Sequence, residues 1–260
     1  MTHPQPHVTL VGAGPGDPEL LTLKAVKAIA AATVLLVDDL VSDAIVAYAA
    51  PSARIIYVGK RGGCQSTPQA FIEKLMLQEA LAGENVVRLK GGDPFIFGRG
   101  GEEVEHLQQQ GVNVTVVNGM TAGLAGVTSL GVPLTHRAHA HGVLFITGHA
   151  KQGATDAVDW AALSHTAAQA KLTLVIYMGM SGAAQLQASL LHGLAPHTPV
   201  AVIQQVSLPT QRHVVCTLSD LHNTVVRERM ASPSVIVVGD VLQGLLHLAR
   251  NQPQRLVAVG

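Results

Sequence analysis

The sequence predicts an α/β protein of two domains, with a mostly parallel sheet in the first and a mixed sheet in the second. Its 260 residues are enough for two domains of ordinary size. In the first half, short apolar runs alternate with helical patterns five times, which predicts a parallel sheet with helices on its faces. In the second half, strand patterns at 200–205 and 212–217 flank a segment containing Pro209, which predicts a hairpin.

The expected elements follow from the spacing of Val, Leu and Ile between glycine-rich loops. The predicted strands of the first domain are 8–11, 33–37, 54–57, 86–89 and 112–117, and those of the second are 143–147, 172–177, 200–205, 212–217 and 234–239. Residues 132–141 break the periodicity, so we place the domains at 1–133 and 134–260. Asp17 or Thr22 begins the first helix, because both residue types cap helices well.

Composition excludes several classes of protein. Hydrophobic residues make up 48% of the chain and charged residues 13%, which favours a folded core over disorder. The formal net charge is zero, which argues against a nucleic-acid partner. Cys64 and Cys216 form neither a disulfide framework nor a zinc motif, so we expect a reducing cytoplasm and no metal. No apolar run approaches the length of a membrane span, so we expect no membrane association.

The longest loop pattern, residues 91–103, follows a buried strand and precedes a helix predicted over 102–110. Its glycines indicate close backbone approach or positive φ angles. Asp93, Arg99 and Glu102 can hydrogen-bond a polar ligand there, since ligands of α/β proteins bind at the carboxyl ends of strands. The alternative is a tight turn with solvated charges. The earlier Gly-x-Gly at 12–14 fits a dinucleotide fingerprint poorly, because two prolines follow it.

Further candidates each carry two interpretations. Asp38 ends a strand, where it is either a ligand or catalytic group or a turn cap. Lys60 and the adjacent Arg61 either meet an anionic ligand or form a solvated pair. Met178 belongs either to the core or to the apolar edge of a cofactor. For the histidines of the 132–141 segment, hydrogen bonding or solvation is favoured over metal ligation, because no acid or cysteine cluster accompanies them.

Several motifs occur together and span nearly the whole chain. They are Val-Gly-Ala-Gly-Pro-Gly-Asp at 11–17, Leu-Leu-Thr-Leu-Lys at 20–24, Val-Gly-Lys-Arg at 58–61, the block at 87–103, Pro-Leu-Thr-His-Arg at 133–137, Thr-Gly-His at 147–149 and Tyr-Met-Gly at 177–179. With these motifs the chain resembles the uroporphyrinogen-III C-methyltransferases of the tetrapyrrole methylase (precorrin methyltransferase) family. The resemblance implies methylation of uroporphyrinogen III at C2 and C7 with S-adenosyl-L-methionine, giving precorrin-2 for sirohaem, cobalamin or haem d1.

The resemblance also implies a homodimer and a cofactor held in a cleft between two α/β domains. The cofactor residues that it implies are Pro15, Gly91, Gly92, Asp93, Ile96, Thr121, Ala122, Met178, and a backbone contact near Ala201 or Val206. The catalytic and substrate-side residues that it implies are Asp38, Lys60, Arg99, Glu102 and Arg137. The chain departs from the family at three positions: Asp39 replaces an arginine, Asn118 a proline and Val206 a glycine.

The chemistry of methyl transfer narrows these roles. The nucleophile is a pyrrole carbon, so the protein must align it with the methyl group and take up a proton. Arg99 is a poor base because its pKa lies at about 12.5 or above, so we expect it to clamp a substrate carboxylate beside Glu102. Asp38, Glu102, a histidine or the substrate's own carboxylates remain candidate proton acceptors. A later precorrin methyltransferase, a binding protein without turnover and a nicotinamide oxidoreductase are the alternative functions.

Overall fold

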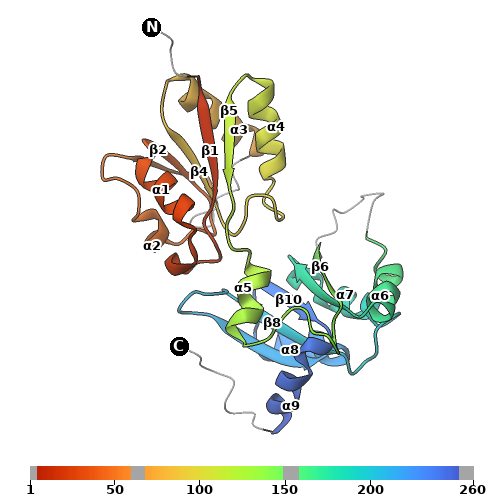
Figure 1. Ribbon diagram of the computed structural model, residues 1–260. Coiled ribbons are helices and arrows are strands. Elements are labelled where there is room, and N and C mark those ends of the chain that lie inside the picture. The colour runs from red at the N-terminus through yellow and green to blue at the C-terminus, as the bar shows by residue number, and fades with distance from the viewer. Residues whose placement is uncertain (1–4, 60–67, 149–157, 252–260) are drawn as a thin grey trace. The chain divides into compact units, whose positions relative to one another are not determined.

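The computed structural model describes residues 5–59, 68–148 and 158–251. The chain divides into two compact units, an N-terminal unit of residues 1–121 and a C-terminal unit of residues 122–260. Each unit contains one five-stranded sheet (Figure 1). None of the helices in the described residues is long and apolar enough to cross a membrane.

The sheet of the N-terminal unit is entirely parallel and has the strand order β3-β2-β4-β1-β5. Because the strands are parallel, all five carboxyl ends lie at one edge. We call the loops that leave this edge, residues 13–17, 38–42, 58–59, 91–99 and 118–121, the rim. The strands are β1 (His7–Gly12), β2 (Val34–Val37), β3 (Arg54–Tyr57), β4 (Val86–Lys90) and β5 (Asn113–Val117).

Helices cover both faces of this sheet, as the repeated strand–helix pattern predicts. On one face Ile29 of α1 packs with Leu35, and on the other Met76 of α3 packs with Leu36. Neighbouring residues of a strand point to opposite faces, so an uninterrupted apolar strand can serve both layers. The helices are α1 (Leu23–Ala31) and α2 (Asp43–Val46) on the first face, and α3 (Gln69–Leu81) and α4 (Gly100–Gln109) on the second.

Local signals at the helix ends agree in part with the sequence. Both predicted caps are used: Asp17 accepts a hydrogen bond from the Glu19 N–H at the short 3-10 turn η1 (Pro18–Leu20), and Thr22 caps α1. The prediction that α4 begins at Glu102 is wrong, because the helix already begins at Gly100. The sequence also missed α2, since four residues are too few to show a helical period.

The sheet of the C-terminal unit is mixed, which confirms the prediction. Its order is β6-β7-β10-β8-β9, with β6 and β7 parallel and the other neighbours antiparallel. The predicted hairpin joins β8 to β9. The elements are α5 (Ala122–Ser129), β6 (Gly142–Thr147), α6 (Trp160–Gln169), β7 (Leu172–Tyr177), the 3-10 turn η3 (Met180–Gly182), α7 (Ala183–Leu190), β8 (Pro199–Gln204), β9 (Arg212–Thr217), α8 (Leu221–Arg227), β10 (Ser234–Val238) and α9 (Gln243–Asn251).

The division between the compact units falls after Thr121, whereas the sequence places the domain boundary after Pro133. Helix α5 lies between these two positions and packs with the C-terminal unit. Its Gly123 and Gly126 allow this packing, because a Cβ atom at those positions would lie 2.5 Å from a methyl group of Val175 and 3.1 Å from one of Ile203. The break in periodicity at 132–141 falls in the segment between the end of α5 and the start of β6.

Candidate functional site

Backbone atoms from three strand ends meet at the rim. Gly14 and Gly92 exchange two hydrogen bonds, with N···O distances of 3.1 and 2.7 Å. A Cβ atom at Gly119 would lie 2.1 Å from the Gly92 carbonyl oxygen, and one at Gly12 would lie 2.4 Å from the Gly119 nitrogen. Only glycine fits at these two positions, because backbone atoms cannot move aside as a flexible side chain can. The glycine-rich loops therefore form a tightly packed edge that carries Pro15, Gly91 and Gly92.

The carboxylate of Asp93 connects two loops of the rim. Asp93 is buried, and its Oδ1 accepts a hydrogen bond from the Phe95 N–H at 2.8 Å. Its Oδ2 accepts from the Gly119 N–H at 3.1 Å and from the Asn118 side-chain amide at 3.3 Å. The departure at Asn118 thus has a local role, since its amide donates to the same carboxylate. Asp93 holds the loop after β4 against the loop that leads to Thr121.

Asp38 lies beside β4, directly after β2. Its N–H donates to the Leu89 carbonyl at 3.0 Å and so extends the ladder between β2 and β4. Its side chain is 35% exposed, and its Oδ1 lies 3.6 Å from Nη2 of Arg88. Two residues further on, Leu40 contacts the next loop, since a Cβ atom at Gly91 would lie 2.7 Å from the Leu40 Cβ. The rim therefore brings Asp38 and the glycines of the longest loop together.

Three charged side chains, Arg88, Lys90 and Glu103, are buried beneath the rim, and sequence reasoning did not select them as site residues. Arg88 Nε lies 3.2 Å from Glu103 Oε1, and Lys90 Nζ lies 3.0 Å from Glu103 Oε2. The second contact is an ion pair without hydrogen-bond alignment, because Oε2 has no hydrogen-bond partner among the described residues. Burial lowers the pKa of Lys90, and the neighbouring Arg88 charge lowers it further.

A sequence signal for these buried charges exists. Arg88 and Lys90 stand two residues apart in an otherwise apolar strand that is covered on both faces. Residues two apart share one face of a strand, so both cations must enter the layer between the sheet and α3 and α4. A buried ion costs several kcal/mol unless it is paired. A partner such as Glu103 is therefore required.

Arg99 and Glu102 form an exposed pair at the start of α4. Arg99 caps the helix with a left-handed backbone, φ 57°, and its Nε donates to the two carboxylate oxygens of Glu102 at 3.0 and 3.1 Å. Both side chains are 55% exposed. The hydrogen bond with Glu102 raises the pKa of Arg99, so its guanidinium stays charged. Ile96, in the loop before this helix, is also exposed.

In the C-terminal unit, three predicted cofactor segments lie around α5. The hydroxyl oxygen of Tyr177 accepts a hydrogen bond from the Gly123 N–H at 2.7 Å, which connects the residue before Met178 with the residue after Ala122. Met178 has a left-handed backbone and an exposed side chain, so it is not a core methionine. The side chain of Val206 lies against Gly126 of the same helix.

Ala201 differs from these residues because it lies in the middle of β8. Its neighbours in the ladders are Val237 of β10 and Val215 of β9, and its side chain is fully buried. Val206 lies beyond the end of this strand, at the start of the turn that leads to β9. Its side chain is buried as well.

Arg137 is exposed in a short turn of the C-terminal unit. Two hydrogen bonds of 2.9 Å between the backbones of His136 and Ala140 close this turn, and His136 Nδ1 accepts from the Ala138 N–H at 3.1 Å. This contact confirms hydrogen bonding for His136. In the described part of the chain, no group of three or more His, Cys, Asp or Glu side chains is placed to hold a metal ion. Lys60, Arg61 and Cys64 lie outside the described residues.

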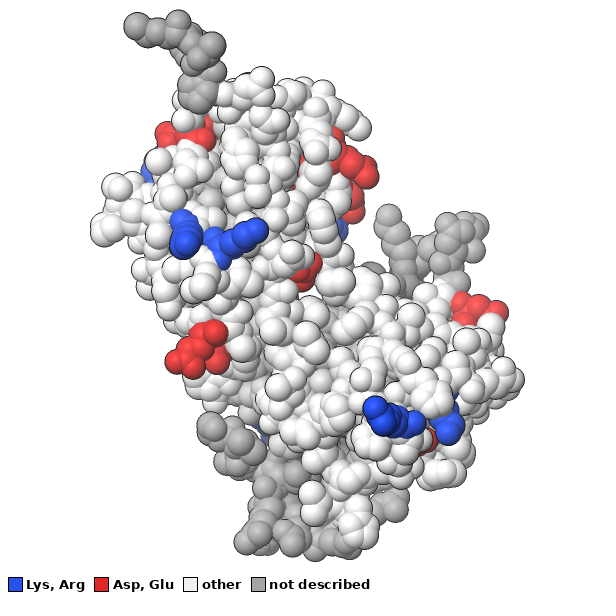
Figure 2. All heavy atoms as spheres, in the orientation of Figure 1, with Lys and Arg blue, Asp and Glu red and all other residues white. Residues whose placement is uncertain are grey.

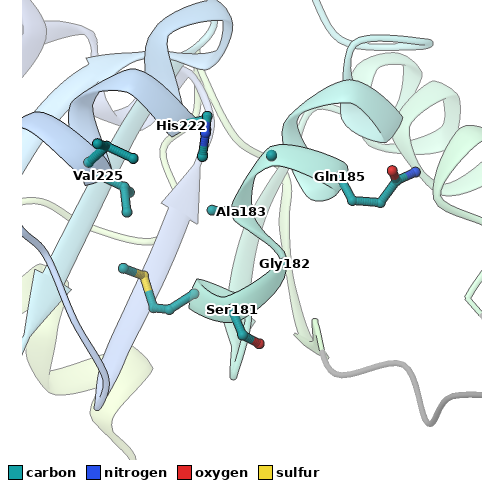
Figure 3. A pocket seen from close by; sticks show the side chains of 9 residues that line it. Ser181, Gly182, Ala183, Gln185, His222 and Val225 are labelled. Atoms are coloured by element: carbon teal, nitrogen blue, oxygen red, sulfur yellow. The ribbon is translucent and has the colours of Figure 1, made fainter.

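Two surface features remain. Figure 2 shows charged side chains scattered over the visible face, with no dense cationic area, in line with the charged content of 13%. A pocket in the C-terminal unit has His222 and Val225 of α8 on one side and Ser181, Gly182 and Ala183 on the other (Figure 3). None of the predicted site residues lines this pocket.

Comparison with known proteins identifies relatives over almost the whole chain. Residues 7–222 match the family of tetrapyrrole (corrin/porphyrin) methylases. The chain is 50% identical to the uroporphyrinogen-III C-methyltransferase of Pseudomonas aeruginosa, over 96% of this chain and 98% of the relative. It is 48% identical to the sirohaem synthase of Azotobacter vinelandii over 91% of this chain, which spans about half (50%) of that protein.

A solved structure also matches. The uroporphyrin-III C-methyl transferase of Thermus thermophilus, complexed with S-adenyl homocysteine, aligns with a TM-score of 0.77 and 39% identity. The alignment covers 92% of this chain and 99% of that one.

Proposed function

Because this chain belongs to the tetrapyrrole (corrin/porphyrin) methylase family, we propose that it methylates uroporphyrinogen III at C2 and C7, using S-adenosyl-L-methionine. The products are precorrin-2 and S-adenosyl-L-homocysteine. The observation that carries this proposal is the 50% identity with a uroporphyrinogen-III C-methyltransferase over 96% of the chain. Precorrin-2 then serves sirohaem, cobalamin or haem d1 synthesis.

The proposed cofactor residues suit a ligand that is held by main-chain groups. At Gly92 a Cβ atom would meet nothing closer than the Thr121 Cα at 4.0 Å, so a ligand can approach the backbone of the rim closely there. The exposed thioether of Met178 offers an apolar contact. The full set is Pro15, Gly91, Gly92, Asp93, Ile96, Thr121, Ala122, Met178, Ala201 and Val206. In this proposal the bound S-adenosylmethionine supplies the electrophilic methyl group.

The proposed catalytic residues divide between binding and proton transfer. Arg99, oriented by Glu102, clamps one carboxylate of the substrate, because a guanidinium matches a carboxylate in two parallel hydrogen bonds. Arg137 adds a second exposed cation. Asp38 and Lys60 are the acid–base pair, and Asp38 accepts the proton that the pyrrole ring releases after methylation. This assignment requires an Asp38 carboxylate that a substrate can reach, and its side chain is 35% exposed.

The remaining predictions complete the proposal. Residues 1–133 provide the substrate side and part of the cofactor site, and residues 134–260 complete the cofactor site. We also predict a homodimer and a cytoplasmic location. We expect no metal, no nucleic-acid partner and no membrane partner.

The direct test is release of S-adenosylhomocysteine, measured with uroporphyrinogen III, with later precorrins and without a tetrapyrrole. We expect turnover with uroporphyrinogen III and two methyl groups in the product. Turnover only with a later precorrin would instead indicate another precorrin methyltransferase. No turnover with any tetrapyrrole would indicate a binding protein.

The variant Arg99→Ala tests the substrate clamp. We expect kcat/KM to fall by about a hundredfold, because charge-assisted hydrogen bonds contribute about 1.5–3 kcal/mol. The affinity for S-adenosylhomocysteine, measured by calorimetry, should stay nearly unchanged. Equal losses of activity and of cofactor affinity would contradict this role.

A further inference from the structure

One of the buried cations beneath the rim, Arg88, contacts Asp38, the proton acceptor of the proposed reaction. In the register of the sheet, Leu36 of β2 pairs with Arg88 of β4. Asp38 comes two residues after Leu36, so its side chain leaves the same face of the sheet as those of Arg88 and Lys90. Arg88 is only 2% exposed, whereas the Asp38 side chain is 35% exposed. Arg88 therefore contacts Asp38 from the protein interior.

The Leu89 carbonyl aligns the two residues. It accepts the Asp38 N–H at 3.0 Å and an Arg88 Nη1 hydrogen at 3.3 Å. The same guanidinium places Nη2 at 3.6 Å from Asp38 Oδ1. Both the backbone and the carboxylate of Asp38 are thus positioned by contacts with residues of β4. This strand is itself held between β2 and β1 in the sheet.

Glu103 holds the other side of the guanidinium. Its Oε1 accepts from Arg88 Nε at 3.2 Å, from Lys90 Nζ at 3.1 Å and from the Gln69 amide at 3.2 Å. Glu103 is completely buried in α4. These contacts fix the Arg88 side chain against α3 and α4, so it cannot swing to another partner.

The charges in this cluster do not cancel without Asp38. Arg88 and Lys90 carry two formal positive charges and Glu103 carries one negative charge, which leaves a surplus of one positive charge. The Asp38 carboxylate is the group that faces this surplus. A buried, uncompensated cation is unfavourable, so the contact with the Asp38 carboxylate compensates the charge of this cluster.

We propose that Arg88 is a positioning residue that orients the Asp38 carboxylate for proton transfer and is itself held in place by Glu103. The inference rests on the proposed function, in which Asp38 is the acid–base group. Arg88 does not touch the substrate in this arrangement and acts only through Asp38.

The test is a double-mutant cycle with Asp38→Asn, Arg88→Met and the double variant, measured in kcat and in the free energy of unfolding. Methionine replaces the aliphatic part of the arginine side chain without its charge, and the substitution leaves Lys90 paired with Glu103, so the variant should fold. We expect Arg88→Met alone to lower kcat about tenfold, within the range of coupling between contacting residues. KM for both substrates should change by less than about threefold. In the Asp38→Asn background, Arg88→Met should have no further effect on kcat.

Arg54→Met is the matched control. Arg54 is an exposed arginine of β3 that pairs with Glu79, so its removal should leave kcat unchanged and its effect should be independent of Asp38→Asn. The variant Arg88→Lys keeps the buried charge and should recover part of the activity. It also replaces Arg88→Met in the cycle if the methionine variant does not fold.

The outcomes separate the two proposals. Multiplicative losses of kcat in the double variant would overturn the positioning role, because they would show that Arg88 acts independently of Asp38. No turnover by the wild-type chain would overturn the proposed function. In that case the unfolding measurements still decide the link between the two residues: additive changes in unfolding free energy overturn it, and non-additive changes support it.

Discussion

The two units bury different kinds of polar side chain. Among the described residues, the N-terminal unit buries the charged side chains Arg88, Lys90, Asp93 and Glu103 together with one hydroxyl, that of Thr9. The C-terminal unit buries only hydroxyls, those of Ser164, Thr173, Thr198 and Thr224.

A hydroxyl can be satisfied by a single carbonyl, as Ser164 is by Ala161 at 2.8 Å, whereas a buried charge needs partners from other elements. In the N-terminal unit, charged side chains therefore connect different elements near the carboxyl ends of the strands. Charges of this kind concentrate at functional sites, where they orient reacting groups. The C-terminal unit instead positions its proposed cofactor residues by packing and by one neutral hydrogen bond.

The largest effect on unfolding free energy is expected at Gly119, in the rim of the N-terminal unit. Gly119→Ala would place a Cβ atom 2.1 Å from a backbone oxygen, so we expect a loss of about 3 kcal/mol of unfolding free energy. Unfolding in urea measures this loss of unfolding free energy. The matched control is Gly101→Ala in α4, where a Cβ atom meets nothing within 4 Å and should stabilise the helix by about 0.5–1 kcal/mol. Equal stability of the two variants would contradict the packed rim.

The next effect is expected at Asp93, the buried link between two rim loops. Asp93→Ala leaves the N–H groups of Phe95 and Gly119 without this acceptor, so we expect a loss of about 1–3 kcal/mol in unfolding free energy. The affinity for S-adenosylmethionine, measured by calorimetry, should fall about tenfold, the equivalent of about 1.4 kcal/mol.

Asp159→Ala serves as its control in the other unit. Asp159 caps α6 by accepting the Ala162 N–H, so its removal costs about 1 kcal/mol of stability without a change in cofactor affinity. An unchanged affinity in Asp93→Ala would count against its role in cofactor binding.

A smaller effect is expected at Tyr177 in the C-terminal unit. Tyr177→Phe removes the acceptor of the Gly123 N–H and so loosens the link between α5 and the end of β7. We expect a loss of about 1 kcal/mol in unfolding free energy and a few-fold lower cofactor affinity. Tyr48→Phe, at an exposed tyrosine of the N-terminal unit, should change neither quantity. If both tyrosine variants behave alike, the hydrogen bond to Gly123 does not position the site.

The smallest effect concerns the pH dependence of the C-terminal unit. Burial lowers the pKa of His213 from its ordinary value of 6.5. The unfolded chain therefore binds this proton first as the pH falls, and stability is lost from about pH 6.5 downward until the folded-state pKa is passed. His213→Gln should reduce the loss of unfolding free energy between pH 7 and 5 by less than about 1 kcal/mol. An unchanged or steeper loss would contradict this assignment, and His192→Gln provides an exposed control.

The sequence predicted the strands well because their residues carry a local signal. Runs such as 54–57 and 172–177 are rich in aliphatic and β-branched residues and each ends in a tyrosine, and the structure has β3 and β7 at these positions. The short helices α2 and α8 escaped prediction because neither is long enough to show a helical period. The candidate site was predicted as a set of loops, and the structure adds what connects the loops, such as the carboxylate of Asp93.

The sequence by itself determined the alternation of strands and helices, the parallel and mixed sheets and the glycine-rich loops, because each depends on spacing along the chain. Only the tertiary structure decided that Glu103 lies between Arg88 and Lys90, and that Arg88 reaches Asp38. These contacts join residues that are up to 50 positions apart in sequence, from Asp38 to Arg88. Their partners are set by sheet register and helix packing, which no local pattern encodes.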